Sequence, residues 1–383
     1  MSYPFPGTAF ACATIVLPYG YAMIDTLVLY CRAGFEKECA TEICARAGAL
    51  GADGYARAKP DSAYVSYHLH DPVAIGALLA DLRWRQLVFA RQMLFAIPLV
   101  TDLPVGDRIT PLLAAVDRLG ESISGPYADV WLETADTNEA KELSAFLKKF
   151  EKPLRSALEK AGRLDTGRTT LPRLHVFFLG SGAAFVAASL PGNSSDWPLG
   201  IPRLRMPRAA PSRSTLKLAE AFMEFVGNRN AGDRLRAGQT AVDLGAAPGG
   251  WSWQFAQREI HVTAIDNGPL DKELMAGGMI EHVRADAFHW RPKRPVDWLV
   301  CDMIEKPARV AALVGDWAAA KLFKEAIFNL KLPMKKRYEE LESCRAIIDG
   351  KLAAAEVEAK VRFKQLYHDR EEVTGHIRLL RSR

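Results

Sequence analysis

The chain lacks the features that mark secreted, membrane-spanning and zinc-binding proteins. Its six cysteines form no CxxC pair and have no histidine cluster at zinc-ligand spacing, so neither a disulfide framework nor a metal site is predicted. No run reaches the ~18 apolar residues of a membrane span. An apolar stretch covers residues 9–17, but Arg32 is the first basic residue, which argues against a secretory signal. We therefore expect a reduced, cytoplasmic protein without a membrane partner.

The composition is that of a folded protein rather than of a disordered or fibrous one. Hydrophobic residues make up 49% and charged residues 25% of the 383 residues, and this length predicts two or three domains. The net charge of +5 permits a polyanionic partner without requiring one. The distribution of charge must therefore decide whether such a partner exists.

The first half of the chain has the pattern of an α/β region and contains no catalytic set. Apolar spacing indicates strands at 27–31, 64–70, 128–134 and 174–179 and helices at 35–47, 72–82, 109–119 and 139–160. His68 and His70 share one face of a predicted strand, but two ligands do not make a metal site. A structural or solvent-facing pair is the better interpretation.

Residues 191–211 mark a break in composition. They contain five prolines and two glycines, which disfavour regular structure. No acid occurs between Asp196 and Glu220, and this acid-free segment carries Arg203, Arg205, Arg208, Arg213 and Lys217. The sequence thus predicts an N-terminal α/β region at 1–190, a basic linker at 191–211 and a second domain at 212–383.

The second domain alternates strands and helices in the pattern of a Rossmann-like fold. Strands are predicted at 240–244, 262–266, 296–302, 326–330, 361–368 and 372–380, and helices at 214–226, 250–258, 307–323 and 335–355. Strands that are separated by helices form a mostly parallel sheet. The last two strands follow each other directly, which predicts an antiparallel C-terminal edge.

The segment from Asp243 to Gly250, DLGAAPGG, is the strongest local motif. It follows a predicted strand and opens a helix, which is where a doubly wound fold binds its ligand. The glycines, which include Gly245 and Gly249, let the backbone approach a ligand closely. The spacing is not GxGxxG and Asp243 would repel a pyrophosphate, so a dinucleotide is disfavoured. A ligand with a cationic part fits better.

Three acids lie at successive predicted strand ends, namely Asp243, Asp266 and Asp286. Asp266 occupies the position from which an acid accepts hydrogen bonds from ribose hydroxyls. Asp286 can accept a hydrogen bond from an adenine amine. Each acid taken singly could be a helix cap or a solvated loop residue. Together they predict S-adenosylmethionine, which joins adenosine to a positive centre.

A second set of charged residues lies at the other strand ends. Asp302 ends one predicted strand, Lys331 ends the next, Glu372 begins the last, and Lys217 lies on the helix that enters the sheet. A neighbouring ammonium and partial burial lower the pKa of a lysine. Lys331 could then accept the proton of an attacking hydroxyl or stabilise the alkoxide as it forms.

Two members of this set have simpler alternative roles. Lys217 could form an ordinary ion pair with Glu220 or Glu224 on the surface of its helix. Glu372 could form an exposed pair with Arg370. Neither alternative is excluded by the sequence.

Five segments of the second domain resemble the FtsJ-type ribose 2'-O-methyltransferases, namely Ser212–Leu218, Asp243–Gly250, Val300–Pro307, Asn329–Arg337 and Tyr367–Thr374. Residues 29–39, LYCRAGFEKEC, are similar to the branch of that family that methylates a cytidine ribose in bacterial 23S rRNA. The resemblance covers nearly the full length of the chain. It implies an S-adenosylmethionine-dependent, Rossmann-like methyltransferase domain preceded by an α/β THUMP-type RNA-binding region.

The resemblance also assigns site residues. The family's Lys-Asp-Lys-Glu tetrad corresponds by motif to Lys217, Asp302, Lys331 and Glu372, with Lys331 as the proton acceptor. The cofactor contacts correspond to Ser214, Gly245, Ala247, Pro248, Gly249, Gly250, Asp266, Asp286 and Asp302. Ala247 stands where relatives can carry cysteine, which matters little because this loop binds largely through its backbone. The choice of Glu372 over Glu371 rests on its place immediately before Val373.

These observations predict methyl transfer from S-adenosylmethionine to a ribose 2'-hydroxyl of 23S rRNA, or of an assembling large-subunit precursor, by a metal-independent monomer. The expected contacts to RNA backbone are Arg203, Arg205, Arg208, Arg213, Lys335, Lys336 and Arg337, together with the N-terminal region. Two rival functions remain. A small-molecule or protein acceptor would leave the basic linker without a role, and an inactive RNA-binding or assembly factor would leave the tetrad without one.

Overall fold

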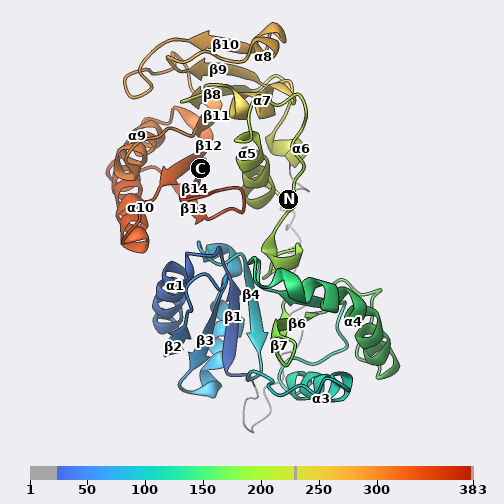
Figure 1. Cartoon of the computed structure of the whole chain (residues 1–383). Helices are drawn as coiled ribbons and strands as arrows, with labels where there is room; N and C mark the ends of the chain where they lie inside the picture. The colour runs from blue at the N-terminus through green and yellow to red at the C-terminus, as the bar shows by residue number, and fades with distance from the viewer. Residues whose placement is uncertain (1–23, 228–230, 381–383) are drawn as a thin grey trace, which may run out of the picture. The chain divides into compact units, whose positions relative to one another are not determined.

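The computed structural model describes residues 24–227 and 231–380, which form two compact units (Figure 1). One unit spans the chain up to Trp84 together with 92–200, and the other contains 85–91 and the chain from Ile201 onward. Cys12 and the apolar stretch at 9–17 lie outside the described residues. The described cysteines are free thiols. None of the helices in the described ranges has the length and apolar character needed to cross a bilayer.

The first unit is built on a seven-stranded sheet in the order β2-β3-β1-β4-β7-β6-β5. Its strands are β1 (Thr26–Tyr30), β2 (Gly54–Arg57), β3 (Tyr64–Leu69), β4 (Gln92–Ala96), β5 (Val130–Thr134), β6 (Arg173–Gly180) and β7 (Ala183–Ser189). Its helices are α1 (Glu36–Ala49), α2 (Ile75–Asp81), α3 (Ile109–Gly120) and α4 (Lys141–Lys160), with 3₁₀ turns η1 (Pro72–Ala74) and η3 (Pro198–Gly200) and, across its boundary, η2 (Trp84–Gln86). Only β5 and β6 pair in parallel; the other strand pairs are antiparallel.

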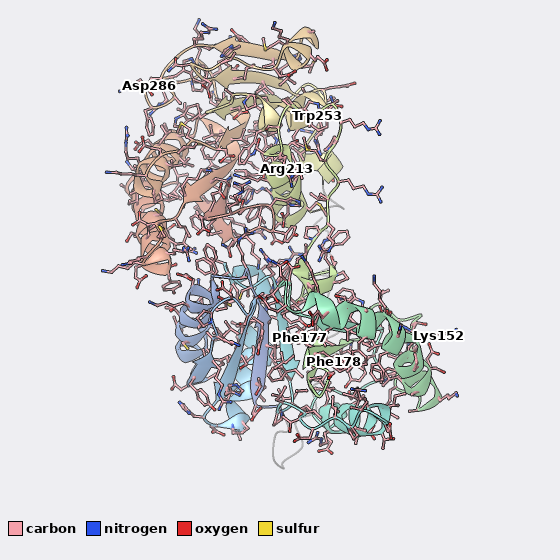
Figure 2. All side chains as sticks on the ribbon, in the orientation of Figure 1. Lys152, Phe177, Phe178, Arg213, Trp253 and Asp286 are labelled. Carbon is pink, nitrogen blue, oxygen red and sulfur yellow. The ribbon has the colours of Figure 1, made fainter. Side chains whose placement is uncertain are left out.

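Two neighbouring phenylalanines show how the first unit covers both faces of its sheet. Side chains alternate between faces along a strand, so Phe177 and Phe178 on β6 point in opposite directions (Figure 2). Phe177 contacts Tyr30 of β1 on one face. Phe178 meets Phe146 and Phe150 of α4 on the other. The sequence pattern did not predict β2 and β4, which are four and five residues long.

The second unit confirms the predicted mostly parallel sheet with an antiparallel C-terminal edge. Its strand order is β10-β9-β8-β11-β12-β14-β13. The strands are β8 (Thr240–Leu244), β9 (His261–Ile265), β10 (Ile280–Val283), β11 (Val296–Cys301), β12 (Phe323–Lys331), β13 (Ala359–Lys364) and β14 (Glu372–Leu379). The first five in this order pair in parallel, and β14 runs antiparallel to both β12 and β13.

Helices cover both faces of this second sheet (Figure 1). They are α5 (Thr215–Ala221), the π-helical turn η4 (Phe222–Val226), α6 (Ala231–Arg234), α7 (Gly250–Ala256), α8 (Lys272–Ala276), α9 (Pro307–Ala319) and α10 (Arg337–Ala354). Figure 1 shows α9 and α10 on one side and α5 and α6 on the other. Between the sheet and its helices, Trp298 of β11 packs against Phe222 and Phe255. The helix predicted at 307–323 ends earlier than expected, because Phe323 already begins β12.

The topology of the second sheet brings the predicted site residues to one edge. Parallel strands end at the same edge, so Asp243, Asp266, Asp302 and Lys331 lie at the carboxyl ends of β8, β9, β11 and β12. Because β14 is antiparallel, its first residue, Glu372, meets that same edge and pairs directly with Lys331. The fold thus gathers charged side chains from distant parts of the chain.

Gly375 provides a test of how tightly β14 packs. It lies opposite Phe328 of β12 and Phe363 of β13, and a Cβ added there would overlap the ring of Phe328. Gly375→Ala is therefore expected to lower the free energy of unfolding by about 1–3 kcal/mol, as measured by chemical denaturation. A Cβ added at Gly350 on α10 meets nothing, so the control Gly350→Ala is expected to raise it by about 0.5–1 kcal/mol. A Gly375→Ala chain as stable as the parent would contradict this packing.

Candidate functional site

The structure brings Lys217, Asp302, Lys331 and Glu372 into one hydrogen-bonded cluster. Lys331 Nζ donates to Asp302 Oδ1 at 2.6 Å and to Glu372 Oε1 at 2.8 Å. Lys217 Nζ, on α5, donates to Glu372 Oε1 at 2.6 Å and to Asp302 Oδ2 at 3.4 Å. Each carboxylate therefore contacts both ammonium groups. The four side chains are only 9–25% exposed, so the cluster is half-buried but open to a substrate.

The simpler pairings considered for Lys217 do not form. Glu220 instead accepts a hydrogen bond from the backbone N–H of His368 at 2.9 Å and contacts the Nδ1 of that ring at 2.6 Å. Glu224 pairs with Arg85 at 3.4 Å. Lys217, which lies one helical turn before Glu220, therefore pairs with the two carboxylates of the cluster.

Glu372 and Glu371 have different surroundings. Glu371 is 60% exposed and pairs with Arg337 at 2.6 Å, away from the two lysines. Glu372 is buried, and its Oε2 accepts the backbone N–H of Arg370 at 2.6 Å while its Oε1 faces the lysines. The geometry therefore places Glu372, and not Glu371, in the cluster.

The pKa of Lys331 is raised, whereas the sequence argument expected it to be lowered. Burial does lower the pKa of Lys331, but the charges and hydrogen bonds of Asp302 and Glu372 outweigh burial. Burial likewise raises the pKa of Glu372, yet hydrogen bonds from Lys217 and Lys331 hold it at about 2. The sequence argument counted the second ammonium but not the carboxylate oxygen that both ammonium groups share. Without further ligands the cluster keeps Lys331 protonated at neutral pH.

The loop from Asp243 to Gly250 needs glycine at positions where a side chain would not fit. Gly245 and Gly249 have φ values of +80° and +113°, which L residues with side chains rarely adopt. A Cβ at Gly245 would collide with Met303, and one at Gly250 would collide with the hydroxyl of Ser214. These glycines let the backbone at the end of β8 pass close to Ser214 and to the loop after β11.

Asp266 ties this loop to the neighbouring strand end. Its Oδ2 accepts the backbone N–H of Ala247 at 3.0 Å, and its Oδ1 accepts that of Gly268 at 2.7 Å. Its side chain is only partly buried, so further lone pairs remain accessible to a ligand hydroxyl. Pro248 is exposed beside it, at the tip of the loop.

Asp286 lies farther along the same edge, in the turn after β10 rather than at the strand end itself (Figure 2). Its Oδ1 accepts the backbone N–H of Phe288 at 2.8 Å, and its Oδ2 contacts His289 Nδ1 at 2.7 Å. These hydrogen bonds lower the pKa of Asp286. Its carboxylate is exposed and retains acceptor capacity.

Asp243 is buried at the root of the loop. Ser252 Oγ donates to its Oδ2 at 2.7 Å. The pKa of Asp243 is raised to about 7, chiefly by burial and also by the nearby charges of Asp302 and Asp266, against the lowering effect of the hydrogen bond from Ser252. Three carboxylates thus act on one another around the loop, which favours a ligand that brings a positive charge.

The predicted RNA-contacting residues are mostly exposed. Side chains open to solvent are those of Arg203, Arg205, Arg208, Arg213, Lys335 and Lys336. Figure 2 labels Arg213, which precedes α5 and the cluster residue Lys217. Arg337 differs, because its guanidinium is mostly covered and pairs with Glu371.

Two polar residues beside the cluster escaped the sequence argument. Asn329 lies two residues before Lys331 on β12, and Thr374 lies two residues after Glu372 on β14. Since side chains two apart share one face of a strand, each polar residue lies on the face of a cluster member. That alternation is visible in the sequence, but only when β12 and β14 are recognised as neighbours.

Family models match three parts of the chain. An FtsJ-like methyltransferase domain matches residues 210–345, an RlmM ferredoxin-like domain matches 24–94, and the N-terminal domain of ribosomal RNA large subunit methyltransferase M matches 107–190. The fold and the charged edge of the second unit, together with the first of these matches, define a Rossmann-like methyltransferase. The THUMP-type description of the N-terminal region is not tested by these matches and stays a prediction.

Full-length relatives define the family more narrowly. Ribosomal RNA large subunit methyltransferase M of Methylococcus capsulatus is 55% identical over 93% of this chain and 99% of its own. That of Thauera aminoaromatica is 51% identical over the whole of both chains. The chain therefore belongs to the ribosomal RNA large subunit methyltransferase M family and is a methyltransferase. Among solved structures, TrmN from Thermus thermophilus covers 93% of this chain and 99% of its own, at 17% identity and a TM-score of 0.34, too low to support an argument.

The raised pKa of Asp243 predicts how stability depends on pH. Asp243 binds its proton more tightly in the folded chain than in the unfolded one, so the free energy of unfolding should fall as pH rises from about 4 to about 7. One such group contributes a slope of at most about 1.4 kcal/mol per pH unit. Asp243→Asn should remove this contribution, whereas Asp349→Asn on the exposed side of α10 should not. Denaturation at several pH values measures both, and parallel curves for Asp243→Asn and the parent would contradict the assignment.

Proposed function

We propose that this protein transfers a methyl group from S-adenosylmethionine to the ribose 2'-hydroxyl of a cytidine in 23S rRNA of the large ribosomal subunit. The hydrogen-bonded cluster of Lys217, Asp302, Lys331 and Glu372 is the observation that carries this proposal. Membership in the methyltransferase M family supports ribosomal RNA as the acceptor. Two lysines that are mostly covered are rarely found without a structural or chemical role, which supports this assignment.

The residues around the glycine loop fit S-adenosylmethionine. Its sulfonium supplies an activated methyl group. We assign the cofactor contacts of this loop to Gly245, Ala247, Pro248, Gly249 and Gly250, and a further contact to the hydroxyl of Ser214. Pro248 is exposed, Gly245 and Ala247 are partly exposed, and buried Gly249 and Gly250 hold the loop against its neighbours. We assign Asp266 to the ribose hydroxyls and Asp286 to the adenine amine, because both carboxylates are accessible and retain acceptor capacity. The carboxylates of Asp243 and Asp302 favour the positive centre.

Lys331 is the proton acceptor in this proposal. Asp302 and Glu372 orient its ammonium, and they raise its pKa, so only the small neutral fraction accepts a proton at neutral pH. The protonated form stabilises negative charge on the oxygen as it develops. Lys217 shares the Glu372 oxygen and helps to hold the nucleotide. Positioning of the hydroxyl against the methyl group supplies much of the acceleration.

We assign recognition of RNA to the basic surface and to the N-terminal region. The proposed parts are an RNA-binding region at 1–190, a linker at 191–211 and a catalytic domain at 212–383. The exposed bases before α5 and after β12 supply phosphate contacts. The acceptor is 23S rRNA or an assembling large-subunit precursor, and the protein acts as a cytoplasmic monomer without a metal.

Lys331→Ala tests the chemical step. Loss of the acceptor is expected to lower the rate of methyl transfer to unmodified 23S rRNA by about 10²–10⁴-fold. Binding of S-adenosylmethionine, measured by calorimetry, should change little. Lys360→Ala on β13, an exposed lysine, is the matched control and should keep the parent rate. Full activity of Lys331→Ala with normal cofactor binding would overturn the proposed mechanism.

Arg205→Gln combined with Arg208→Gln tests the RNA surface. Because each arginine that neutralises a phosphate releases counterions, each loss should reduce the slope of log affinity against log salt by about 0.7–0.9. Affinity for 23S rRNA fragments should fall at low salt while cofactor affinity stays constant. Arg236→Gln, an exposed arginine outside the predicted surface, serves as the control. An unchanged salt slope in the double variant would remove these residues from the interface.

A further inference from the structure

We propose that Asn329, Thr374 and Asp369 form a directional hydrogen-bond chain that fixes Asp302 toward Lys331, and that Asn329 and Thr374 are positioning residues for methyl transfer. The inference rests on the proposed function, in which Lys331 handles the proton of the acceptor hydroxyl. The three residues of this hydrogen-bond chain are buried beside the cluster and are not among its four members.

The contacts form an unbroken path. Asn329 Nδ2 donates to Asp302 Oδ1 at 3.1 Å, on the same oxygen that receives Lys331 Nζ at 2.6 Å. Thr374 Oγ1 lies 2.8 Å from Asn329 Oδ1, and it lies 3.2 Å from Oδ1 and 2.9 Å from Oδ2 of Asp369. The backbone N–H of Leu366 donates to Asp369 Oδ2 at 3.0 Å. Asn329, Thr374 and Asp369 are at most 1% exposed, so water does not compete for these contacts.

The direction of the path follows from counting donors. Asp302 faces two ammonium groups as a carboxylate and can only accept, so the amide of Asn329 must turn its NH₂ toward it. The amide oxygen then faces Thr374, whose single hydroxyl proton must be donated to it. That hydroxyl has no second proton for Asp369, so the Asp369–Thr374 contact needs a proton on Asp369. Oδ1 carries this proton, because Oδ2 accepts the backbone N–H of Leu366. Each donor in the path then has one acceptor.

The environment of Asp369 agrees with a neutral carboxylic acid. Burial raises the pKa of Asp369 well above its ordinary value, and the charges of Glu372 and Glu220 add to this effect. The backbone N–H of Leu366 and the hydroxyl of Thr374 oppose it only in part. A neutral acid at the far end lets Thr374 act as a donor toward Asn329.

Strand register explains why these residues meet. In the antiparallel pairing of β12 with β14, Lys331 lies opposite Glu372 and Asn329 lies opposite Thr374. The two pairs are two residues apart, so they share one face of the sheet. The register that brings Lys331 beside Glu372 therefore also brings Asn329 beside Thr374. Asp302 joins them from β11, the parallel neighbour of β12.

The role differs from that of a merely packed polar pair. The amide of Asn329 neutralises part of the charge on Asp302 Oδ1. Without this donor, Asp302 would rotate more freely and would hold the proton of Lys331 more strongly. The expected result is a slower reaction together with a higher pKa of Lys331, at unchanged cofactor affinity.

Thr374→Val, which removes the hydroxyl at nearly constant shape, is the first test. We expect the turnover number to fall about tenfold, the effect of one hydrogen bond of about 1.4 kcal/mol, with Kd values for S-adenosylmethionine and RNA unchanged. Thr374→Ser keeps the hydroxyl and should restore the parent rate. The pKa of Lys331, followed by NMR of lysines labelled at the ε-carbon, should rise in Thr374→Val and not in Thr374→Ser. An unchanged rate and pKa in Thr374→Val would overturn the inference.

Asp369→Asn tests the direction of the chain. An asparagine amide can still donate to Thr374 and accept from Leu366, so it replaces a neutral acid but not a carboxylate. We expect Asp369→Asn to keep the parent rate within about twofold and to keep the pKa of Lys331. A loss as large as that of Thr374→Val would overturn the proposed direction. The NMR measurement needs no RNA. If the parent protein fails to methylate 23S rRNA, the proposed function is refuted, and the hydrogen-bond chain can still be tested through the pKa of Lys331.

Discussion

The pairing of β14 with β12 is the constraint on which the whole site depends. Because β14 runs antiparallel beside a parallel strand, its first residue meets the edge where parallel strands end. Glu372 thereby lies opposite Lys331, and Thr374 lies opposite Asn329. A slip of one residue would turn both β14 side chains to the other face of the sheet. The packing of Gly375 against Phe328 helps to fix this register, since no side chain fits there.

The charged side chains at this edge stabilise one another against the unfavourable free energy of burying each charge. Burial disfavours an ammonium at Lys331 and a carboxylate at Glu372, yet their contact raises the first pKa and lowers the second. Removing one member would leave the others buried and uncompensated, which costs more than losing an exposed ion pair. The same mutual hold makes Lys331 reluctant to give up its proton. The contacts that order the cluster therefore also reduce the neutral fraction of Lys331 at neutral pH.

Much of this site could be predicted from the sequence, and the missing parts share one physical reason. Asp302, Lys331 and Glu372 could be predicted as neighbours because each ends or begins an apolar run, and Lys217 because it lies on the helix that leads into the sheet. The pKa of Lys331 was predicted with the wrong sign, because it depends on which oxygen the two ammonium groups share. Asn329 and Thr374 were not predicted, because their role depends on the pairing of β12 with β14. The paired residues Lys331 and Glu372 are 41 residues apart in the sequence. Local patterns give positions, whereas contacts between distant segments set charge states.

Asp302 links the two groups of charges in the second unit. It bonds to Lys331 on one side, and its charge acts on buried Asp243 at the glycine loop on the other. The charges of Asp302 and Asp266 raise the pKa of Asp243, and Asp302 also raises the pKa of Lys331. A positive charge beside the loop would be shared among these carboxylates, and Asp302 would then hold the proton of Lys331 less strongly. The acid-rich loop and the two lysines are therefore one electrostatic system, joined through Asp302.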